Sequence, residues 1–308
     1  MRALVTGATG FVGGRLAGAL LDEGAELGCL VRDAGRAAEL EERGATLHEG
    51  DVLRPETLSG ALDGADVAYY LVHGMGRGSQ GSFEERERRA ARNFARAARE
   101  AEVGRVVYLG GLGERPHSEH LRSRHETGRI LAAEGPPLTY FRAAMVVGCG
   151  SESYKTLRDL VKRLPVMIAP SWLKTPTQPI DIDDAVAYLS QAPELEAAAG
   201  REIEIGGPDV LSYGDMLDRM ALALDKRPRP KVAVPVLSPR LSSLWIGLVT
   251  PVDAGVARPL IEGLSTETVV NDPSGASLFD VAPIGVDQAL RKALAEEEEE
   301  AVPAAAVP

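Results

Sequence analysis

The sequence predicts an α/β protein built on a doubly wound parallel sheet, with a smaller, irregular C-terminal subdomain. Three observations predict this class. Short apolar runs alternate with longer helical stretches up to about residue 145, a glycine-rich turn follows the first run, and proline punctuation begins after residue 150. The 308 residues are 44% hydrophobic and 26% charged, which is enough apolar chain for one large core or two joined ones.

Six strands and five connecting helices are expected in the N-terminal half. The strands are expected at Ala3 to Thr6, Glu26 to Val31, Thr46 to Glu49, Val67 to Val72, Arg105 to Leu109 and Leu138 to Phe141. The helices are expected near Gly14 to Leu21, Ala34 to Arg43, Glu56 to Leu62, Phe83 to Glu100 and Leu121 to Ala133. Because a helical stretch long enough for a crossover separates most of the strands, we expect parallel pairing with helices on both faces of the sheet.

The pattern becomes less regular after residue 150. We expect an N-terminal domain over residues 1–150, to which 178–205 returns, and a C-terminal substrate or partner subdomain over 151–177 and 206–295. The apolar segment 237–264 could line a substrate pocket, dock on a partner or a membrane surface, or form core, which is the simplest interpretation. The glutamate run that begins at residue 296 cannot bury enough apolar surface to order itself, so we expect 296–308 to be a disordered acidic tail.

Charge and hydropathy exclude several classes of protein. Lys and Arg number 34 and Asp and Glu number 45, and a net charge of −11 repels a phosphate backbone, so we expect no nucleic-acid partner. The longest apolar run, 241–252, is far shorter than a membrane-spanning helix, so no transmembrane segment is expected. The N-terminus lacks the pattern of a signal peptide, which favours a cytoplasmic protein. Cys29 and Cys149 form no CxxC motif and are expected to be buried free thiols.

A glycine-rich motif, TGATGFVG at residues 6–13, directly follows the first expected strand and opens the first helix. Its spacing is GxxGxxG. Gly7 and Gly10 let the turn tighten so that backbone N–H groups approach a pyrophosphate at the helix N-terminus, and Gly13 lets the helix pack closely on the strand. The motif predicts a nucleotide site that contains Gly7, Thr9, Gly10, Phe11 and Val12.

The end of the second strand decides which form of the cofactor is expected. Arg32 and Asp33 follow that strand and indicate opposite choices. A guanidinium pairs with a 2′-phosphate and stacks on adenine, whereas a carboxylate accepts hydrogen bonds from free ribose hydroxyls and repels phosphate. Because Arg32 lies nearer the strand, NADP(H) is favoured and NAD(H) is the alternative. Arg32 could also be an ordinary surface arginine.

Two further strand ends complete the expected cofactor site. After the third strand, Asp51 could place a carboxylate by the adenine amino group and Val52 an apolar side chain under the ring. After the fourth strand, Leu71, Val72 and His73 would cover the ribose next to the nicotinamide. A plain loop histidine is an equally good interpretation of His73.

With these residues in place, the chain resembles the short-chain dehydrogenase/reductase superfamily, in particular its atypical or extended NmrA-like members, over most of residues 1–205. The resemblance rests on TGATGFVG, GDV at 50–52 and PIDIDD at 179–184, in order and spacing. IEIGGPDVLSY at 203–213 also resembles the join between core and substrate subdomain in these proteins. The resemblance implies a Rossmann-type fold, an NAD(P) cofactor, a C-terminal substrate subdomain, and a monomer or homodimer.

The catalytic residues of this superfamily are missing here. Members with ordinary redox chemistry carry Ser or Thr after the fifth strand and Tyr-x-x-x-Lys on the next helix, where this chain has GGLG at 110–113 and HLRSR at 120–124. Arg124 could hold the nicotinamide ribose as a fixed cation with several donors. His120 is the candidate proton donor or acceptor because an imidazole titrates near neutral pH. His120 could instead be a helix-entry residue without chemistry, and Tyr154 is an outside candidate for a phenolic acid.

Two classes of function follow. The first is an NAD(P)H-dependent oxidoreductase or related isomerase that transfers a hydride to or from a small organic substrate, with His120 and Arg124 as catalytic residues. The second is a non-catalytic NADP(H)-binding sensor or assembly protein, which the missing serine and tyrosine favour. We expect no metal site, because the group His117, Glu119, His120 and His125 has no zinc-ligand spacing.

Overall fold

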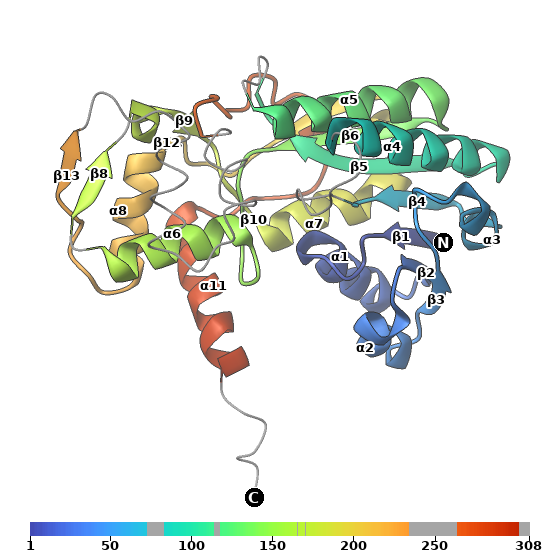
Figure 1. Ribbon diagram of the computed structural model, residues 1–308, viewed down its shortest axis with the longest axis horizontal. Coiled ribbons are helices and arrows are strands. Elements are labelled where there is room, and N and C mark those ends of the chain that lie inside the picture. Colours follow the sequence, from blue (N-terminus) through green and yellow to red (C-terminus); the bar gives the residue numbers. More distant parts are fainter. Residues whose placement is uncertain (73–82, 114–117, 165, 170, 234–263, 302–308) are drawn as a thin grey trace, which may run out of the picture. The chain divides into compact units, whose positions relative to one another are not determined.

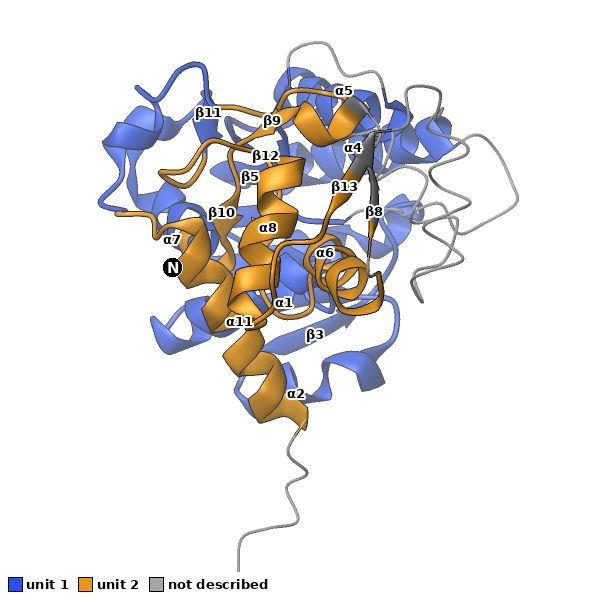
Figure 2. Cartoon of the chain, turned by 90° about the vertical axis from the view of Figure 1, so that its left-hand side faces the viewer, with its two compact units in different colours: residues 1–143, 185–205, 270–281 blue, residues 144–184, 206–269, 282–308 orange. Residues whose placement is uncertain are grey.

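The computed structural model describes residues 1–72, 83–113, 118–164, 166–169, 171–233 and 264–301 (Figure 1). The chain forms two compact units (Figure 2). The first comprises residues 1–143, 185–205 and 270–281, and the second comprises 144–184, 206–269 and 282–308. The chain therefore leaves the first unit after Ala143 and returns to it twice, where we expected one return.

The first unit contains a sheet of seven parallel strands in the order β11-β6-β5-β4-β1-β2-β3. The strands are β1 (Arg2–Thr6), β2 (Glu26–Val31), β3 (Thr46–Glu49), β4 (Val67–Tyr70), β5 (Arg105–Gly111), β6 (Leu138–Ala143) and β11 (Glu202–Ile205). The doubly wound class and all six expected strands are confirmed, and β11 extends the sheet beyond β6. The strand order reverses between β1 and β4, which is where a dinucleotide binds in such sheets.

Helices cover both faces of this sheet, as Figure 1 shows. The first unit contains α1 (Phe11–Asp22), α2 (Ala38–Glu42), α3 (Ser59–Leu62), α4 (Phe83–Glu100), α5 (Glu119–Glu134) and the greater part of α7 (Ile182–Gln191). Short 3₁₀ turns at Ala34–Ala37 and Pro55–Thr57 precede α2 and α3. The expected helices 34–43 and 56–62 are therefore each divided. Pro55 begins the turn, where its missing N–H has no cost, and Gly60 is a weak helix former that limits the second stretch to one helical turn.

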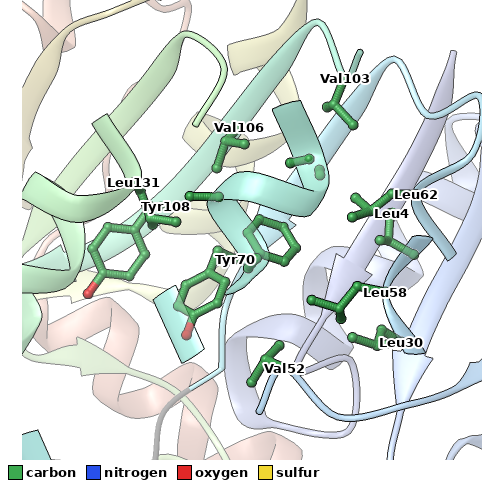
Figure 3. Close-up of a cluster of buried hydrophobic side chains, with 14 of the residues drawn as sticks. Leu4, Leu30, Val52, Leu58, Leu62, Tyr70, Val103, Val106, Tyr108 and Leu131 are labelled. Carbon is green, nitrogen blue, oxygen red and sulfur yellow. The ribbon is translucent and has the colours of Figure 1, made fainter. Parts of the chain in front are cut away.

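The core beneath α4 and α5 contains three tyrosines in one row across the sheet. Tyr70 on β4 is paired with Tyr108 on β5, and Tyr108 with Tyr140 on β6. Ring centroids are 6.0 Å apart in the first pair and 5.1 Å apart in the second. Leu4, Leu30, Leu58 and Leu62 continue the same buried cluster toward β2 and α3 (Figure 3). This row fixes α4 and α5 on the sheet through aromatic and aliphatic burial.

The second unit has its own core and is less regular, as expected. It contains α6 (Glu152–Arg163), α8 (Tyr213–Ala223) and α11 (Val286–Ala301), with paired short strands β7 (Val146–Val147), β8 (Met167–Ala169), β9 (Pro176–Thr177), β10 (Ile180–Asp181), β12 (Leu211–Ser212) and β13 (Lys231–Ala233). Buried side chains of the three helices pack together. Most of the expected apolar segment 237–264 lies outside the described residues, so its three interpretations stay predictions.

The acidic tail is helical where the structure describes it, which corrects our expectation of disorder for residues 296–301. α11 continues to Ala301. Glu297 pairs with Arg158 on α6 and accepts a hydrogen bond from the Tyr154 hydroxyl over 3.3 Å. Composition alone gave no sign of this because each partner lies far from the glutamate run in the sequence. Residues 302–308 lie outside the described part of the chain.

Both cysteines are buried and free, as expected. Burial raises the pKa of Cys29 to about 12, so this thiol keeps its proton at neutral pH. Among the helices of the described residues, none has the length and apolarity needed to span a membrane.

Candidate functional site

The loop between β1 and α1 adopts a conformation that requires glycine. Gly7 has a φ of +74°, and a Cβ there would lie 2.5 Å from the Leu71 carbonyl oxygen just beyond β4. A Cβ at Gly13 would lie 2.2 Å from the Gly7 carbonyl oxygen. The Gly10 N–H donates to that same oxygen over 2.9 Å and closes the turn. The tight turn and the close helix packing that the motif predicts are both present.

The N-terminus of α1 presents backbone donors. The helix begins at Phe11, has no side-chain cap at Gly10, and carries no acidic residue in its first turn. N–H groups of a first turn have no acceptor within their own helix, and the helix dipole favours an anion there. Thr9 and Gly10 are exposed, whereas Phe11 and Val12 are half-buried. The residue types and the geometry fit a pyrophosphate at this position.

Thr6 ties the loop to the neighbouring strand, a role that the sequence did not reveal. Its hydroxyl donates to the Tyr69 carbonyl oxygen over 3.0 Å and accepts from the Leu71 N–H over 3.2 Å. Leu71 is buried and Val72 is half-buried beside this contact. His73, the third residue expected there, lies outside the described residues.

Arg32 and Asp33 have different environments at the end of β2. The Asp33 carboxylate caps the following 3₁₀ turn by accepting from the Gly35 N–H over 3.1 Å. Arg32 is exposed and forms no hydrogen bond or ion pair with any described residue. One carboxylate oxygen of Asp33 is therefore used in a local hydrogen bond, whereas the Arg32 guanidinium is available to a ligand.

The loop after β3 is held by side chains from two other elements. The Asp51 carboxylate accepts from the Leu53 N–H over 2.9 Å, and the Asp51 N–H donates to the Thr57 hydroxyl over 3.0 Å. Val52 is buried, and its carbonyl oxygen accepts from the Asn93 amide of α4 over 3.0 Å. The sequence did not indicate a role for Asn93, because it lies among the charged residues of α4, which are typical of a solvent-exposed helix face. Val52 therefore belongs to the buried cluster of the first unit, and the hydrogen bond from Asn93 holds its backbone.

His120 and Arg124 contact each other on α5. The Arg124 Nε–H donates to the His120 Nε2 over 3.0 Å, and the terminal nitrogens of Arg124 form no hydrogen bond with described residues. Ser118 begins the helix by accepting from the Leu121 N–H over 3.2 Å. Burial, reinforced by the Arg124 charge, lowers the pKa of His120 from 6.5 to about 3. At neutral pH this imidazole is uncharged, with Nε2 as an acceptor.

This arrangement predicts how acid affects stability. The imidazole of the unfolded chain binds a proton near pH 6.5, whereas His120 in the folded chain resists protonation down to about pH 3. The contribution of His120 is complete above pH 6.5 and is lost as the pH falls toward 3. In His120→Gln, whose amide oxygen can still accept from Arg124, the free energy of unfolding is expected to fall less between neutral pH and about pH 5. Urea titrations at the two pH values measure the difference, and equal losses in both proteins would contradict this protonation state.

A serine side chain would be crowded at the position where the superfamily carries one, most of all at Gly110. A Cβ at Gly110 would lie 2.7 Å from the Tyr140 ring, and a Cβ at Gly111 would lie 2.6 Å from Leu121 Cδ2. Burial raises the pKa of the Tyr70, Tyr108 and Tyr140 hydroxyls. The packing of Tyr140 on β6 is therefore compatible with glycine at position 110 and would have to shift to accept a serine. Among the described residues, no three His, Cys, Asp or Glu side chains gather as metal ligands.

Comparison with known proteins gives one family and several distant relatives. Residues 7–143 match a family described as NAD(P)H-binding. The photosystem II assembly factor Ycf39 of Synechocystis sp. is 26% identical over 215 residues, which cover 67% of this chain and 63% of Ycf39. An NAD(P)H azoreductase of Xenophilus azovorans is 27% identical over 222 residues, which cover 65% of this chain and 74% of that protein. The chain thus matches less than two thirds of the length of Ycf39.

Solved structures share the fold. The triphenylmethane reductase of Citrobacter sp. has a TM-score of 0.75 and 17% identity, over 96% of this chain and 100% of that one. The same enzyme has also been solved with NADP(H). The UDP-glucuronic acid 4-epimerase of Bacillus cereus, solved with UDP-glucuronic acid and NAD, has a TM-score of 0.74 and 18% identity, over 97% and 100% of the two chains. The expected Rossmann-type fold is confirmed.

Proposed function

We propose that the protein is an NADP(H)-dependent oxidoreductase acting on a small organic substrate. The match of residues 7–143 to the NAD(P)H-binding family supports this proposal. The observation that carries the proposal is the uncapped N-terminus of α1 behind the Gly7 turn, which fits a pyrophosphate. When bound, the cofactor supplies or accepts a hydride. The proposal includes a cytoplasmic location, a monomer or homodimer, and no nucleic-acid partner.

The phosphorylated cofactor is favoured by the environment of two side chains. Arg32 is exposed and unpaired among the described residues, so its guanidinium can meet a 2′-phosphate. Asp33 uses one carboxylate oxygen to cap a turn, which leaves it less able to accept from ribose hydroxyls. NAD(H) remains the alternative cofactor, and in that case Asp33 would bind the ribose.

The residues of α5 support a positioning role for His120 and a binding role for Arg124. The neutral His120 fixes one edge of the Arg124 guanidinium, and the terminal nitrogens of Arg124 can then donate to the nicotinamide ribose or to the substrate. This departs from our expectation that His120 donates the proton, because a pKa of about 3 leaves almost no imidazolium at neutral pH. If His120→Gln keeps the activity and His120→Ala loses it, His120 acts by positioning Arg124 and not by proton transfer.

A substrate that needs no tyrosine acid suits this site best. Reduction of a ketone develops negative charge on oxygen, which a nearby acid normally neutralises. Azo bonds, enones and triarylmethyl cations accept a hydride at an electron-poor atom and depend less on such an acid. One relative is an azoreductase, and one structural neighbour is a triphenylmethane reductase. In the azo case the N=N bond gains one hydride from NADPH and one proton from water, leaving N–N with hydrogen on each nitrogen.

The test is NADPH oxidation by the full chain with four substrates: an azo dye, a cationic triphenylmethane dye, an enone and a ketone. We expect turnover with at least one of the first three and none with the ketone. Arg124→Ala is expected to lower kcat/KM about tenfold through a lost charged hydrogen bond, whereas Arg99→Ala, which removes an exposed arginine in the last turn of α4, leaves it unchanged. Ketone reduction with a pH inflection near 6.5 that disappears in His120→Gln would contradict the proposal by making His120 the acid.

A second function is favoured by two observations. Gly110 lies against the Tyr140 ring, which crowds the position of the serine found in redox members, and one relative of this chain is the photosystem II assembly factor Ycf39. A nucleotide-binding sensor or assembly protein would bind NADPH tightly and oxidise none of the four substrates. That outcome would favour this function over the first.

A further inference from the structure

A pocket of about 510 Å³ lies within the first unit, between one face of α5 and the edge of the sheet. His125, Gly128, Arg129 and Ala132 line it at helical spacing, and Tyr140, Arg142 and Glu202 line it from β6 and β11. Its lining includes none of the residues of the glycine-rich loop. The volume is in the range of small-molecule sites.

The lining is basic in a chain whose net charge is −11. Among the residues that the structure describes, three arginines and one acidic residue, Glu202, line the pocket. The Glu202 carboxylate accepts from Arg142 over 2.6 Å, and the same Arg142 nitrogen donates to Glu204 over 3.4 Å, so Arg142 partly offsets the charge of Glu202. Arg129 and Arg201 are exposed, and their guanidinium groups form no hydrogen bond or ion pair with described residues. Two guanidinium groups therefore remain available at one pocket.

Buried contacts hold the wall of the pocket in place. Arg142 donates to the Gly111 carbonyl oxygen over 3.2 Å and to the Gly113 carbonyl oxygen over 3.0 Å, in addition to its pairing with Glu202. The Tyr140 N–H donates to the Arg201 carbonyl oxygen over 2.9 Å, which places Arg201 beside the wall. The Tyr140 hydroxyl is buried and has no hydrogen-bond partner among the described residues. The wall is thus a built part of the sheet rather than a chance gap between side chains.

We propose that this pocket binds a small polyanionic metabolite that carries phosphate or carboxylate groups. Arg129 and Arg201 bind the anionic groups by charge-assisted hydrogen bonds, and His125 and Tyr140 border the rest of the ligand. His125 donates from Nε2 to the Gly111 carbonyl oxygen over 3.0 Å when it is neutral, so Nδ1 is free to accept from a ligand hydroxyl. The site is additional to the proposed cofactor site and does not depend on it.

The experiment is calorimetric titration of the full chain with two probes, citrate for carboxylates and inorganic pyrophosphate for phosphates. We expect binding of at least one probe, weakened about tenfold by Arg129→Ala and by Arg201→Ala separately. Arg99→Ala removes the same charge from the last turn of α4 and is expected to leave binding unchanged. The proton signals of the His125 ring, assigned with His125→Gln, are expected to shift on titration.

Two results would overturn the proposal. One is the absence of binding for both probes at millimolar concentration. The other is citrate binding that persists in the Arg129→Ala, Arg201→Ala double variant, which would place the citrate outside this pocket. Because pyrophosphate also fits the N-terminus of α1, Gly7→Ala serves as a second arm: loss of pyrophosphate binding there, with citrate binding retained, separates the two sites. Failure of the proposed oxidoreductase activity would leave this result unaffected.

Discussion

Gly7→Ala is expected to lose about 2 to 5 kcal/mol of the free energy of unfolding and all measurable nucleotide affinity. A φ of +74° costs an L-residue about 1 to 2 kcal/mol. The new Cβ would also lie 2.5 Å from the Leu71 carbonyl oxygen. Because this oxygen belongs to the backbone, β4 or the loop must shift, at a further cost of about 1 to 3 kcal/mol. The same shift moves the N–H groups that would bind the pyrophosphate.

Gly24→Ala is the matched control. Gly24 has a φ of +78°, but a Cβ there meets no atom within 4 Å. This variant is therefore expected to lose only the conformational part, about 1 to 2 kcal/mol, and to keep its nucleotide affinity. Urea unfolding and nucleotide titration of the two variants measure the difference. If the two were equally stable and bound nucleotide equally well, the close approach of β4 to the loop would have no energetic role.

Gly110→Ser, which restores the residue type found in redox members, is expected to destabilise the protein by about 1 to 3 kcal/mol and to add no activity. The serine Cβ would lie 2.7 Å from the Tyr140 ring, which is itself confined on its other edge, where a Cβ at Gly128 would lie 2.6 Å away. The ring cannot move aside without disturbing its stacking on Tyr108. The cost therefore comes from overpacking a buried site rather than from the hydroxyl group.

Two comparisons test this explanation. Gly60→Ser adds the same side chain at an exposed glycine with no atom within 4 Å, and it is expected to change the unfolding midpoint little. Combining Gly110→Ser with Tyr140→Leu is expected to destabilise less than the sum of the single changes, because the smaller side chain removes the clash. An additive double variant, or a stable and more active Gly110→Ser, would contradict the view that packing excludes the serine.

The inner strands of the sheet could be predicted from the sequence because β1, β4, β5 and β6 are buried on both faces and so form nearly continuous apolar runs. β1 to β6 lie where expected to within two residues at either end. The turn after β1 could also be predicted, because the positive φ and the close contacts at position 7 require a glycine there. The seventh strand of the sheet lies about 60 residues beyond β6 in the chain, and its return depends on tertiary pairing with β6.

The side-chain chemistry was less predictable because it depends on contacts between residues and on burial. His120 looks like a group that titrates near neutral pH until the Arg124 hydrogen bond and the burial of the ring are known. The different environments of Arg32 and Asp33 became visible only with the cap on Gly35. The glutamates at 296–300 read as a disordered tail, yet Glu297 pairs with Arg158, more than a hundred residues away.

The measurement that tests the central claim most directly is thermal unfolding of the full chain with NADPH, NADP, NADH and NAD in separate titrations. A ligand that binds only the folded state stabilises it by about 2.7 kcal/mol at a hundredfold excess over its Kd. The account predicts a rise in Tm with NADPH and NADP that exceeds the rise with NADH and NAD, is lost in Arg32→Ala and is kept in Arg99→Ala. An unchanged Tm with all four nucleotides would contradict it.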